Sequence, residues 1–528
     1  MTQKSPSIFK KSSDLAVLTV ISRILGLVRE SVTAALLGTG VLADAFSVAF
    51  IVPDMVRRLF ADGVMSAAFI PQFKGLVTEN KRERAAEFLN AVFSIVTVSA
   101  FVTVVILMVF SGNLVSVLSP SFDAESAEEA AFLAKIMFPY IFFITLAALI
   151  QSVLNSSGIF RPSGTSPIVF NITFITLAFL LAPLSSDPAR ALSVGVLAGG
   201  FMQMAVQFPF MAKTFFRFRF VGLRRAFADP LIKKSPKMIL ATLFGTGAYQ
   251  INILLTTNFA SKAGVGVVSS LRFSARIEEL ILGIFVVSLS TVILPELVEN
   301  AKSGNGAALE KNLSSALNFV AFISIPAVIF TVFNSDEMVK LLFGFGKFDG
   351  TSVSLTSDAL RFRIFGLFFI AVSRIMISLF YAFEKTNVPI IAGLTSIIVN
   401  FAAAYFLVDS LAGGGIALAS AVSAFSCAAI LFAYSFFFFK GALNLGKVSL
   451  YFVKISIISV ISLLPALFLK GQIYAFFDTV SLPQKICELC SFSAVSLVFA
   501  VLFIMITVLS KDETIGSFKK EVVFKKSH

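Results

Sequence analysis

Long apolar runs alternate with short polar breaks along the whole chain. Each run exceeds the roughly 18 residues that separate a membrane-spanning helix from a buried helix of a soluble protein. The apolar positions are continuous, without the period of two that marks the strands of an outer-membrane barrel. The second, eighth and tenth runs are interrupted by charges. The pattern predicts an all-α polytopic membrane protein with about fourteen transmembrane helices, at 14–37, 44–72, 86–111, 130–154, 165–184, 190–212, 237–261, 265–297, 313–333, 357–383, 388–408, 414–439, 449–469 and 484–509.

The composition supports a membrane protein and excludes several other classes of protein. Hydrophobic residues make up 57% of the 528 residues and charged residues only 14%, whereas about a quarter of the residues in a soluble domain are charged. A soluble enzyme and a disordered chain are therefore excluded. The chain has 3 Cys and a single His, His528. Three cysteines are too few for a disulfide framework. A single histidine at the end of the chain excludes His-based catalysis and a His-ligated zinc site.

The distribution of Lys and Arg predicts the orientation of the spans. The formal net charge of +13 suits either nucleic acid or an anionic membrane as a partner. Because the chain is so apolar, we expect its partner to be the membrane and expect no binding of nucleic acid. If both termini lie inside, the inside segments carry 26 Lys and Arg and the outside loops carry 6. By the positive-inside rule, both termini are predicted to be cytoplasmic.

The longest predicted inside linker, 213–237, holds eight basic residues. We interpret it as an anchor on anionic lipid in preference to a specific ligand site. Short matches about 225 residues apart, such as 69–71 with 293–295, indicate a parallel repeat like those of secondary transporters. The predicted divisions are an N-terminal lobe at 1–212, a basic cytoplasmic linker at 213–236, a C-terminal lobe at 237–440, and two further spans with a basic tail at 441–528.

Eleven basic residues lie within the predicted spans. A charge at mid-bilayer costs at least about 2.5–3.5 kcal/mol, so such residues line a wet cavity, pair with a carboxylate or reach the membrane surface. Lys135 and Lys454 lie close to the ends of their spans, and we expect them to snorkel. The other nine cluster in spans 1, 2, 8 and 10: Arg23, Arg29, Arg57, Arg58, Arg272, Arg276, Arg361, Arg363 and Arg374.

Sequence spacing predicts which of these arginines are neutralised. Asp54, Arg58 and Asp62 are spaced at i, i+4 and i+8 on one helix face, so Arg58 is predicted to have an acidic neighbour on both sides. Arg276 has Glu279 at i+3. Pro53, directly before the first of these groups, predicts a break in span 2.

Two arginines have no predicted partner close in sequence. Arg23 and Glu30 share a face of span 1, whereas Arg29 points away from it, and Arg57 points away from the stripe around Arg58. Guanidinium groups in a wet cavity bind phosphate or carboxylate through paired hydrogen bonds. Arg29 and Arg57, followed by Arg276, are therefore the candidate anion-binding residues. Internal ion pairs that brace the helix bundle remain the alternative interpretation.

The sequence contains no nucleotide-binding or metal-binding motif. The G-x-x-x-x-G-K-[ST] loop of ATPases is absent, and 344–347 lacks its spacing. Cys487 and Cys490 supply too few ligands for zinc, and we interpret them as small apolar residues on a helix face. We therefore expect a transporter that is not an enzyme, without cofactor or metal, driven by the membrane potential or an ion gradient.

Six short runs of the sequence form a recognisable set. They are SRILGLVRE at 22–30, ADAF at 43–46, PDMVRRLFADG at 53–63, SARIEEL at 274–280, FGFGKF at 343–348 and KTNVP at 385–389. These runs resemble the bacterial MurJ (MviN) family, whose members are lipid II flippases of the multidrug/oligosaccharidyl-lipid/polysaccharide exporter superfamily. The resemblance extends over the whole chain, and its first block is specific to the family.

The resemblance implies two pseudo-symmetric six-helix lobes in a V, with spans 13 and 14 forming a groove for a prenyl tail. It implies that a monomer in the bacterial cytoplasmic membrane, surrounded by membrane lipids, moves lipid II from the inner to the outer leaflet by alternating access. This cargo is an undecaprenyl-pyrophosphate-linked disaccharide-pentapeptide used in peptidoglycan synthesis. The matching substrate-binding residues are Arg23, Arg29, Arg57, Arg276 and Asp44, of which Arg29, Arg57 and Arg276 would bind the pyrophosphate. Supporting ion pairs are expected at Glu30, Asp54, Arg58, Asp62 and Glu279.

The chain also departs from the family pattern. Glu30 replaces the usual Asp, Ala275 stands where some relatives have Asp, and Arg272 is an added charge. Spans 237–261 and 388–408 contain no Asp or Glu, which argues against the sodium site of some relatives. An exporter of another polyprenyl-linked oligosaccharide stays open as an alternative. A cation-coupled drug antiporter, the other alternative, should have an acidic cavity in place of these arginines.

Overall fold

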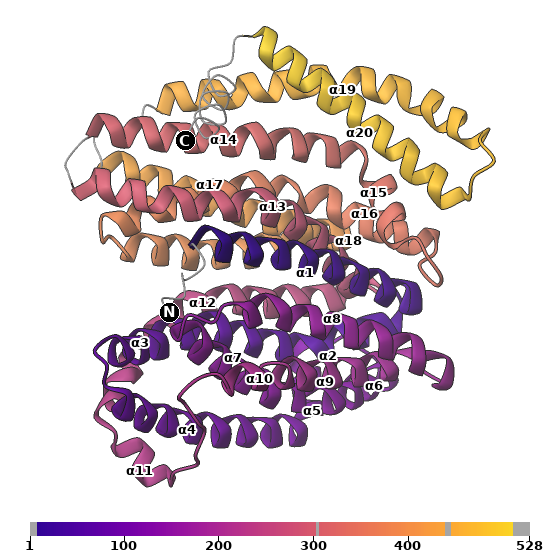
Figure 1. Ribbon diagram of the computed structural model, residues 1–528. Helices are drawn as coiled ribbons and strands as arrows, with labels where there is room; N and C mark the ends of the chain where they lie inside the picture. Colours follow the sequence, from indigo (N-terminus) through magenta and orange to yellow (C-terminus); the bar gives the residue numbers. More distant parts are fainter. Residues whose placement is uncertain (1–7, 303–305, 439–444, 511–528) are drawn as a thin grey trace. The chain divides into compact units, whose positions relative to one another are not determined.

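The structure is a computed structural model that describes residues 8–302, 306–438 and 445–510. Every regular element within these ranges is a helix (Figure 1), which confirms the predicted all-α class. The chain divides into two compact units. Unit 1 comprises residues 1–269 and 345–352, and unit 2 comprises 270–344 and 353–528.

Unit 1 is built from the helices up to α12. They are α1 (Ile8–Leu37), α2 (Val41–Arg58), the π-helix η1 (Leu59–Phe69), α3 (Ile70–Thr78), α4 (Arg82–Val109), α5 (Ser111–Leu118), α6 (Ala124–Met137), α7 (Pro139–Ser156), α8 (Arg161–Leu181), the 3-10 helix η2 (Ala182–Leu184), α9 (Pro188–Ala205), α10 (Phe208–Met211), α11 (Leu223–Ala228) and α12 (Pro230–Ala263). Because α12 packs on η1 and α5, it belongs to unit 1 although it follows the basic linker. The division into lobes at that linker stays a prediction.

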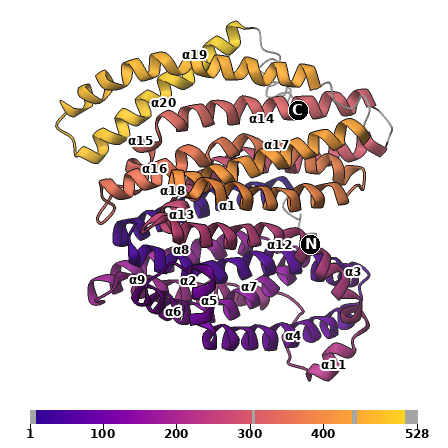
Figure 2. The same ribbon diagram turned by 180° about the vertical axis from the view of Figure 1, so that it is seen from behind.

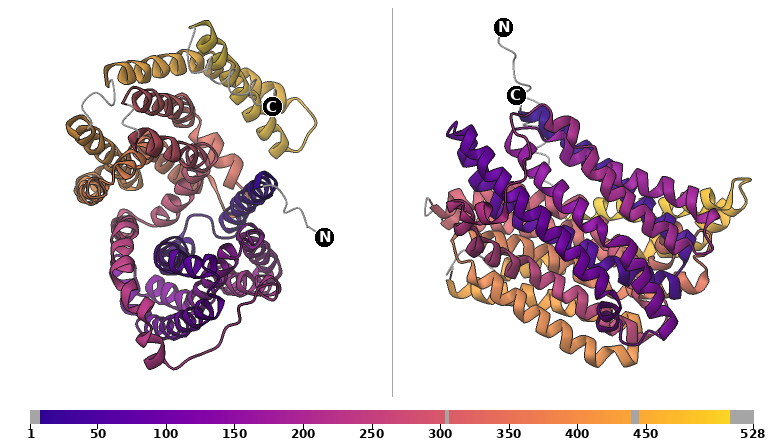
Figure 3. Two further views of the ribbon diagram at one scale, coloured as in Figure 1. Left: turned by 60° about the vertical axis from the view of Figure 1, so that its left-hand side comes forward. Right: turned by 90° about the horizontal axis from the view of Figure 1, so that it is seen from below.

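Unit 2 is built from the later helices. They are α13 (Val267–Lys302), whose first residues belong to unit 1, α14 (Gly306–Phe333), α15 (Ser335–Phe343), α16 (Gly350–Arg363), α17 (Phe365–Ala382), α18 (Asn387–Phe438), α19 (Leu445–Asp478) and α20 (Gln484–Leu509). The hairpin of α19 and α20 packs along α14 (Figures 1 and 2). Ile455 and Phe503 lie in the apolar contact against Ala321 and Ile325. Figure 3 shows the helices from two further directions.

Within the described ranges, nine helices are long and apolar enough to cross a membrane. One of them, α18, covers two of the predicted spans, 388–408 and 414–439, with a break at Ala412. The helices α1, α2 and α13 are absent from the nine, and they are the ones that carry most of the arginines inside predicted spans. The protein is therefore a multi-pass membrane protein, and the count of fourteen spans stays a prediction.

Span 2 is helical throughout, so the break predicted at Pro53 is wrong. Pro53 lies inside α2, and the chain continues into η1 and α3 without leaving helical geometry. A proline removes only one backbone hydrogen bond, which packing against neighbouring membrane helices tolerates. The irregularity comes later, where Leu59–Phe69 winds as a π-helix. Such winding is rare and is frequently found at functional sites.

A segment distant in sequence closes over the α1–α2 turn within unit 1. The backbone N–H of Lys347 donates to the carbonyl of Ala35 over 2.8 Å, and the hydroxyl of Ser352 accepts the N–H of Thr39 over 3.0 Å. Gly38 has φ +65°, and a Cβ there would lie 2.6 Å from the carbonyl oxygen of Lys347. Glycine at position 38 is therefore required both for the turn and for the close approach of residues 345–352.

Candidate anion-binding site

Arg29 and Glu30 are neighbours on α1 and form an ion pair. The Nη2 of Arg29 donates to Oε1 of Glu30 over 2.7 Å, and the two side chains are 11% and 1% exposed. The prediction that Arg29 lacks a partner close in sequence is therefore wrong. Although successive side chains on a helix point about 100° apart, the arginine side chain is long enough to bend back to its neighbour.

Two phenylalanines of α8 also hold the Arg29 guanidinium. Its Cζ lies 5.3 Å from the ring centre of Phe170 and 5.8 Å from that of Phe174, both within the range of cation–π attraction. Phe170 in turn packs on Gly199 of α9, where a Cβ would lie 2.8 Å from the ring. The absence of a side chain at 199 lets α8 and α9 approach closely enough to place Phe170 under Arg29.

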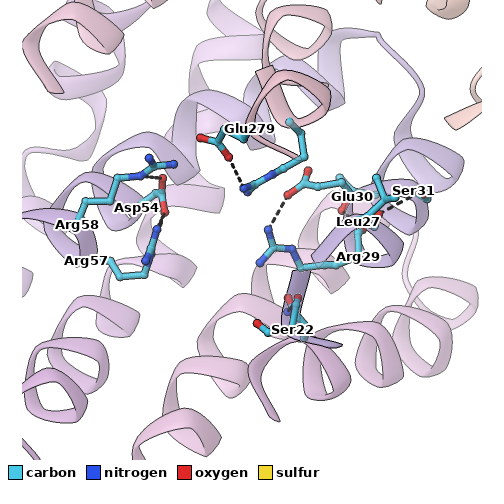
Figure 4. A network of polar contacts seen from close by, with 12 residues as sticks. Ser22, Leu27, Arg29, Glu30, Ser31, Asp54, Arg57, Arg58 and Glu279 are labelled. Atoms are coloured by element: carbon cyan, nitrogen blue, oxygen red, sulfur yellow. Dashed lines mark hydrogen bonds and ion pairs between the residues drawn. The ribbon is translucent and has the colours of Figure 1, made fainter. Parts of the chain in front are cut away.

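Asp54 on α2 is shared between two arginines, as Figure 4 shows. Its Oδ1 accepts Nε and Nη2 of Arg57 over 3.0 and 2.8 Å, and its Oδ2 accepts Nε of Arg58 over 2.9 Å. The predicted Arg58–Asp54 pair is confirmed. The prediction that Arg57 lacks a sequence-local partner is wrong, because Asp54 precedes Arg57 by three residues and a carboxylate has two oxygens to offer.

The Asp54 cluster is partly exposed. The side chains of Arg57 and Arg58 are 34% and 25% exposed. Arg57 binds Asp54 through one edge of its guanidinium, and Nη1 on the other edge donates to no residue in the described ranges. The outer edge of the Arg57 guanidinium is therefore a place where a further anion can bind.

Asp44 is buried near the start of α2, and both of its oxygens are engaged. Oδ2 accepts the backbone N–H of Gly266 over 2.6 Å, and Oδ1 accepts that of Ser269 over 2.8 Å. These two donors lie at the beginning of α13, within unit 1, where backbone N–H groups have no partner in their own helix. In this conformation Asp44 therefore holds the start of α13. Contact of Asp44 with substrate stays a prediction.

Unit 2 carries the third arginine of the predicted set. The Nη1 of Arg276 donates to Oε2 of Glu279 over 2.7 Å, which confirms the predicted pair. Both side chains are about one third exposed, at 30% and 37%. Glu279 therefore orients Arg276 while part of the arginine side chain stays accessible.

Arg23 and Asp62 are the two other charged residues of the predicted set. Arg23 lies half-buried on α1 and forms no ion pair with any residue in the described ranges, while Glu30, on the same predicted face, is bound to Arg29. The side chain of Asp62, in η1, lies outside the described part of the structure, so its predicted contact with Arg58 stays a prediction.

Sequence reasoning missed one buried ion pair in unit 2. Arg363 of α16 lies 3.6 Å from Glu278 of α13, and the side chains are 14% and 9% exposed. Buried Nε of Arg363 has no hydrogen-bond partner among the described atoms. The pair joins residues 85 positions apart, a distance at which no helical spacing predicts contact. The only signal in the sequence was the unexplained presence of charges in both spans.

The remaining arginines of span 10 are separate from this pair. Arg361 donates to Asp358 over 3.0 Å and to Asp336 over 3.1 Å. Arg374 is exposed on α17 and forms no ion pair with a residue in the described ranges. Four guanidiniums thus have a carboxylate one to four positions away that orients them in an apolar protein, those of Arg29, Arg57, Arg58 and Arg276.

Comparison with known proteins identifies the family to which the chain belongs. A sequence model described as "Lipid II flippase MurJ" matches residues 33–487. The probable lipid II flippase MurJ of Treponema pallidum is 36% identical over 475 residues, which cover 88% of this chain and 89% of the relative. The probable lipid II flippase MurJ of Rhizobium meliloti is 34% identical over 435 residues, covering 81% and 80%.

Solved structures share the fold at lower identity. A lipid II flippase MurJ in an inward closed conformation has a TM-score of 0.77 at 23% identity, covering 94% of this chain and 99% of that one. An inward-facing multidrug transporter of the MATE family has a TM-score of 0.68 at 14% identity, covering 81% and 95%. At these identities the likeness concerns the fold alone.

Proposed function

The chain belongs to the MurJ family of lipid II flippases, and from that premise we propose how its own residues serve the transport of lipid II. The disaccharide-pentapeptide headgroup enters a cavity open to the cytoplasm while the undecaprenyl tail stays in lipid. Arg29, Arg57 and Arg276 bind the pyrophosphate. Rocking of the two halves of the protein then exposes the headgroup to the outer face.

The Asp54 cluster is the observation that carries this proposal. Asp54 lies between Arg57 and Arg58, and the outer edge of the Arg57 guanidinium is available to a phosphate oxygen. A pyrophosphate offers several negatively charged oxygens, and an arginine binds such a group by two parallel hydrogen bonds. A cationic drug would be repelled by the same cluster.

The C-terminal hairpin is suited to the tail of the cargo. Residues of α19 such as Leu450, Leu464 and Phe468 are exposed and apolar. A polyprenyl chain binds such a surface through apolar contact alone, without a polar partner. We therefore assign the hairpin of α19 and α20 to the tail.

The membrane potential is the proposed driver of the return step. After the headgroup leaves, the cavity keeps its arginine charges, and an inside-negative potential favours their movement toward the cytoplasm. Each elementary charge that crosses the field contributes about 2.3 kcal/mol per 100 mV. The chain is proposed to act as a monomer in the cytoplasmic membrane with both termini inside.

Rescue of a bacterium depleted of its own lipid II flippase tests the proposal. Cells that express this chain should regain growth and should present lipid II on the outer leaflet, measured by its access to an enzyme added outside. The variants Arg29→Gln, Arg57→Gln and Arg276→Gln should each lower export by roughly 10- to 100-fold, because each removes a charge-assisted contact worth about 1.5–3 kcal/mol.

A matched control loses the same charge away from the site. Lys135 is exposed on α6 near a span end, and Lys135→Gln should export lipid II like the unaltered chain. If the three arginine variants also exported normally, the assignment of the pyrophosphate site would be wrong. If the unaltered chain failed to restore export, lipid II would not be its cargo.

A further inference from the structure

The basic linker, which follows α10 and extends into the first turns of α12, has almost no internal neutralisation. Residues 213–237 contain eight Lys and Arg and one carboxylate, Asp229. Asp229 is buried, accepts the N–H of Leu231 at the start of α12 over 2.8 Å, and pairs with Arg84 of α4 at 2.8 Å. The single acid of the linker is therefore bound to a basic residue outside the linker, and the linker's positive charge remains.

This linker is folded against α4. Asn90 accepts the backbone N–H of Arg219, and Ser94 accepts that of Val221, each over 2.8 Å. The short helix α11 then packs beside α4 (Figures 1 and 2). These contacts fix where the side chains of the linker lie.

The contacts also place the linker at the membrane surface. The helix α4 is one of the nine that can span the membrane, and its 28 residues correspond to about 42 Å, close to the thickness of a bilayer with its headgroups. The charged and polar start of this helix ends at Asn90, and the apolar stretch 91–109 that follows is about 28 Å long, close to the thickness of the hydrocarbon core. The backbone of Arg219 is therefore close to the boundary between headgroups and hydrocarbon.

Two phenylalanines of the linker pack on neighbouring helices, whereas its arginines are exposed. Phe216 packs on Phe73 and Phe218 on Phe93, each pair of ring centres 4.9 Å apart, while Arg217 between them donates to the carbonyls of Thr214 and Phe216. The exposed basic residues that follow form no ion pair with any residue in the described ranges: Arg219, Arg224 and Arg225.

Three large rings are exposed beside these arginines. Phe215, Phe220 and Phe227 are 59%, 59% and 55% exposed. Aromatic rings favour the headgroup level of a bilayer, where basic side chains meet lipid phosphates. An acidic protein surface would satisfy the arginines but would leave the rings without an apolar environment. The combination therefore favours lipid.

We propose that this linker platform, made of Arg219, Arg224, Arg225, Phe215, Phe220 and Phe227, binds the headgroups of anionic phospholipids in the inner leaflet. The arginines contact the phosphates, and the rings enter the interface next to them. The proposal gives the protein a lipid-binding surface separate from the site for its cargo. It depends on the cytoplasmic orientation of the linker and not on the assignment of Arg29, Arg57 or Arg276.

Retention of phospholipid by the purified full chain tests this proposal. Native mass spectrometry would compare phosphatidylglycerol with phosphatidylcholine added to the detergent-solubilised protein. The double variant Arg224→Gln/Arg225→Gln should retain phosphatidylglycerol roughly 10- to 30-fold more weakly, with phosphatidylcholine unaffected. Phe220→Ser/Phe227→Ser should weaken retention as well, with less dependence on salt.

The control pair loses the same charge elsewhere on the predicted cytoplasmic side. Lys311, in the first turns of α14, and Lys385, between α17 and α18, are exposed, and Lys311→Gln/Lys385→Gln should retain phosphatidylglycerol like the unaltered chain. Equal retention by the two double variants would overturn the proposal and would favour an acidic protein as the partner of this surface. A lower melting temperature of the arginine variant in phosphatidylcholine would overturn it too, because the arginines would then serve the fold.

Discussion

Asp54 determines the geometry of both arginines at the end of α2. Its two oxygens bind Arg57 and Arg58 on different sides, so the carboxylate acts as a spacer that keeps two like charges apart and oriented. The arginine pair would otherwise repel and adopt several rotamers. We propose that Asp54 serves the site by positioning these two arginines.

Replacement of Asp54 tests that positioning role. Asp54→Asn keeps the size of the side chain but removes its charge, so Arg57 should lose its fixed orientation and export of lipid II should fall by roughly tenfold, the loss of one charge-assisted hydrogen bond. Asp54→Glu restores the charge and should recover most of the export. Equal export by the Asn and Glu variants would contradict the positioning role.

Ala412, at the break in α18, has a backbone conformation that L-residues rarely adopt. Its φ is +45° and its ψ −125°, a region populated essentially by glycine. Ala412→Gly should therefore raise stability by about 1 kcal/mol, seen as a higher melting temperature of the purified protein. Ala419→Gly, inside the same helix and buried, should lower it instead. A lower melting temperature for Ala412→Gly would show that the position is not strained.

At the scale of elements, the Glu278–Arg363 pair joins α13 to α16 inside unit 2. Glu278 lies two positions after Arg276, so it points about 200° away from it around the helix. The pair therefore fixes the rotation of α13, and with it the direction in which Arg276 and Glu279 face. We propose that the pair supports Arg276 from the opposite side of the helix.

A double-mutant cycle measures this connection. Glu278→Met or Arg363→Met alone leaves an uncompensated buried charge and should destabilise the protein by about 3–5 kcal/mol, whereas the double Met variant should be close to the unaltered protein in melting temperature. Additive losses in the double variant would mean that the two residues do not act as a pair.

Most helices could be predicted from the apolar runs, because a spanning helix must form its backbone hydrogen bonds internally and must be apolar over its length. Ion pairs were predicted less well. Arg276–Glu279 and Arg58–Asp54 followed from helical spacing, but the Arg29–Glu30 contact depends on a bent side chain and the Glu278–Arg363 contact on tertiary packing. The π-winding of η1 had no sequence signal, since winding depends on how α2, α12 and η1 pack.

At the scale of the whole molecule, the excess of 26 over 6 Lys and Arg predicts that both termini are cytoplasmic. In a variant whose three natural cysteines are replaced, Asn80→Cys should react with a membrane-impermeant thiol reagent only after cells are opened, and Ser186→Cys should react in intact cells. Both positions are exposed. The reverse labelling would invert the orientation and place the linker platform outside.

The affinity of the protein for lipid II depends directly on whether Arg57 binds the pyrophosphate. The full chain is placed in nanodiscs without anionic phospholipid, so that the linker platform does not contribute, and binding of lipid II is titrated. Arg57→Gln should bind at least about tenfold more weakly than the unaltered chain, while Lys135→Gln should bind equally well. Undiminished binding by Arg57→Gln would contradict the claim that the arginine next to Asp54 receives the pyrophosphate.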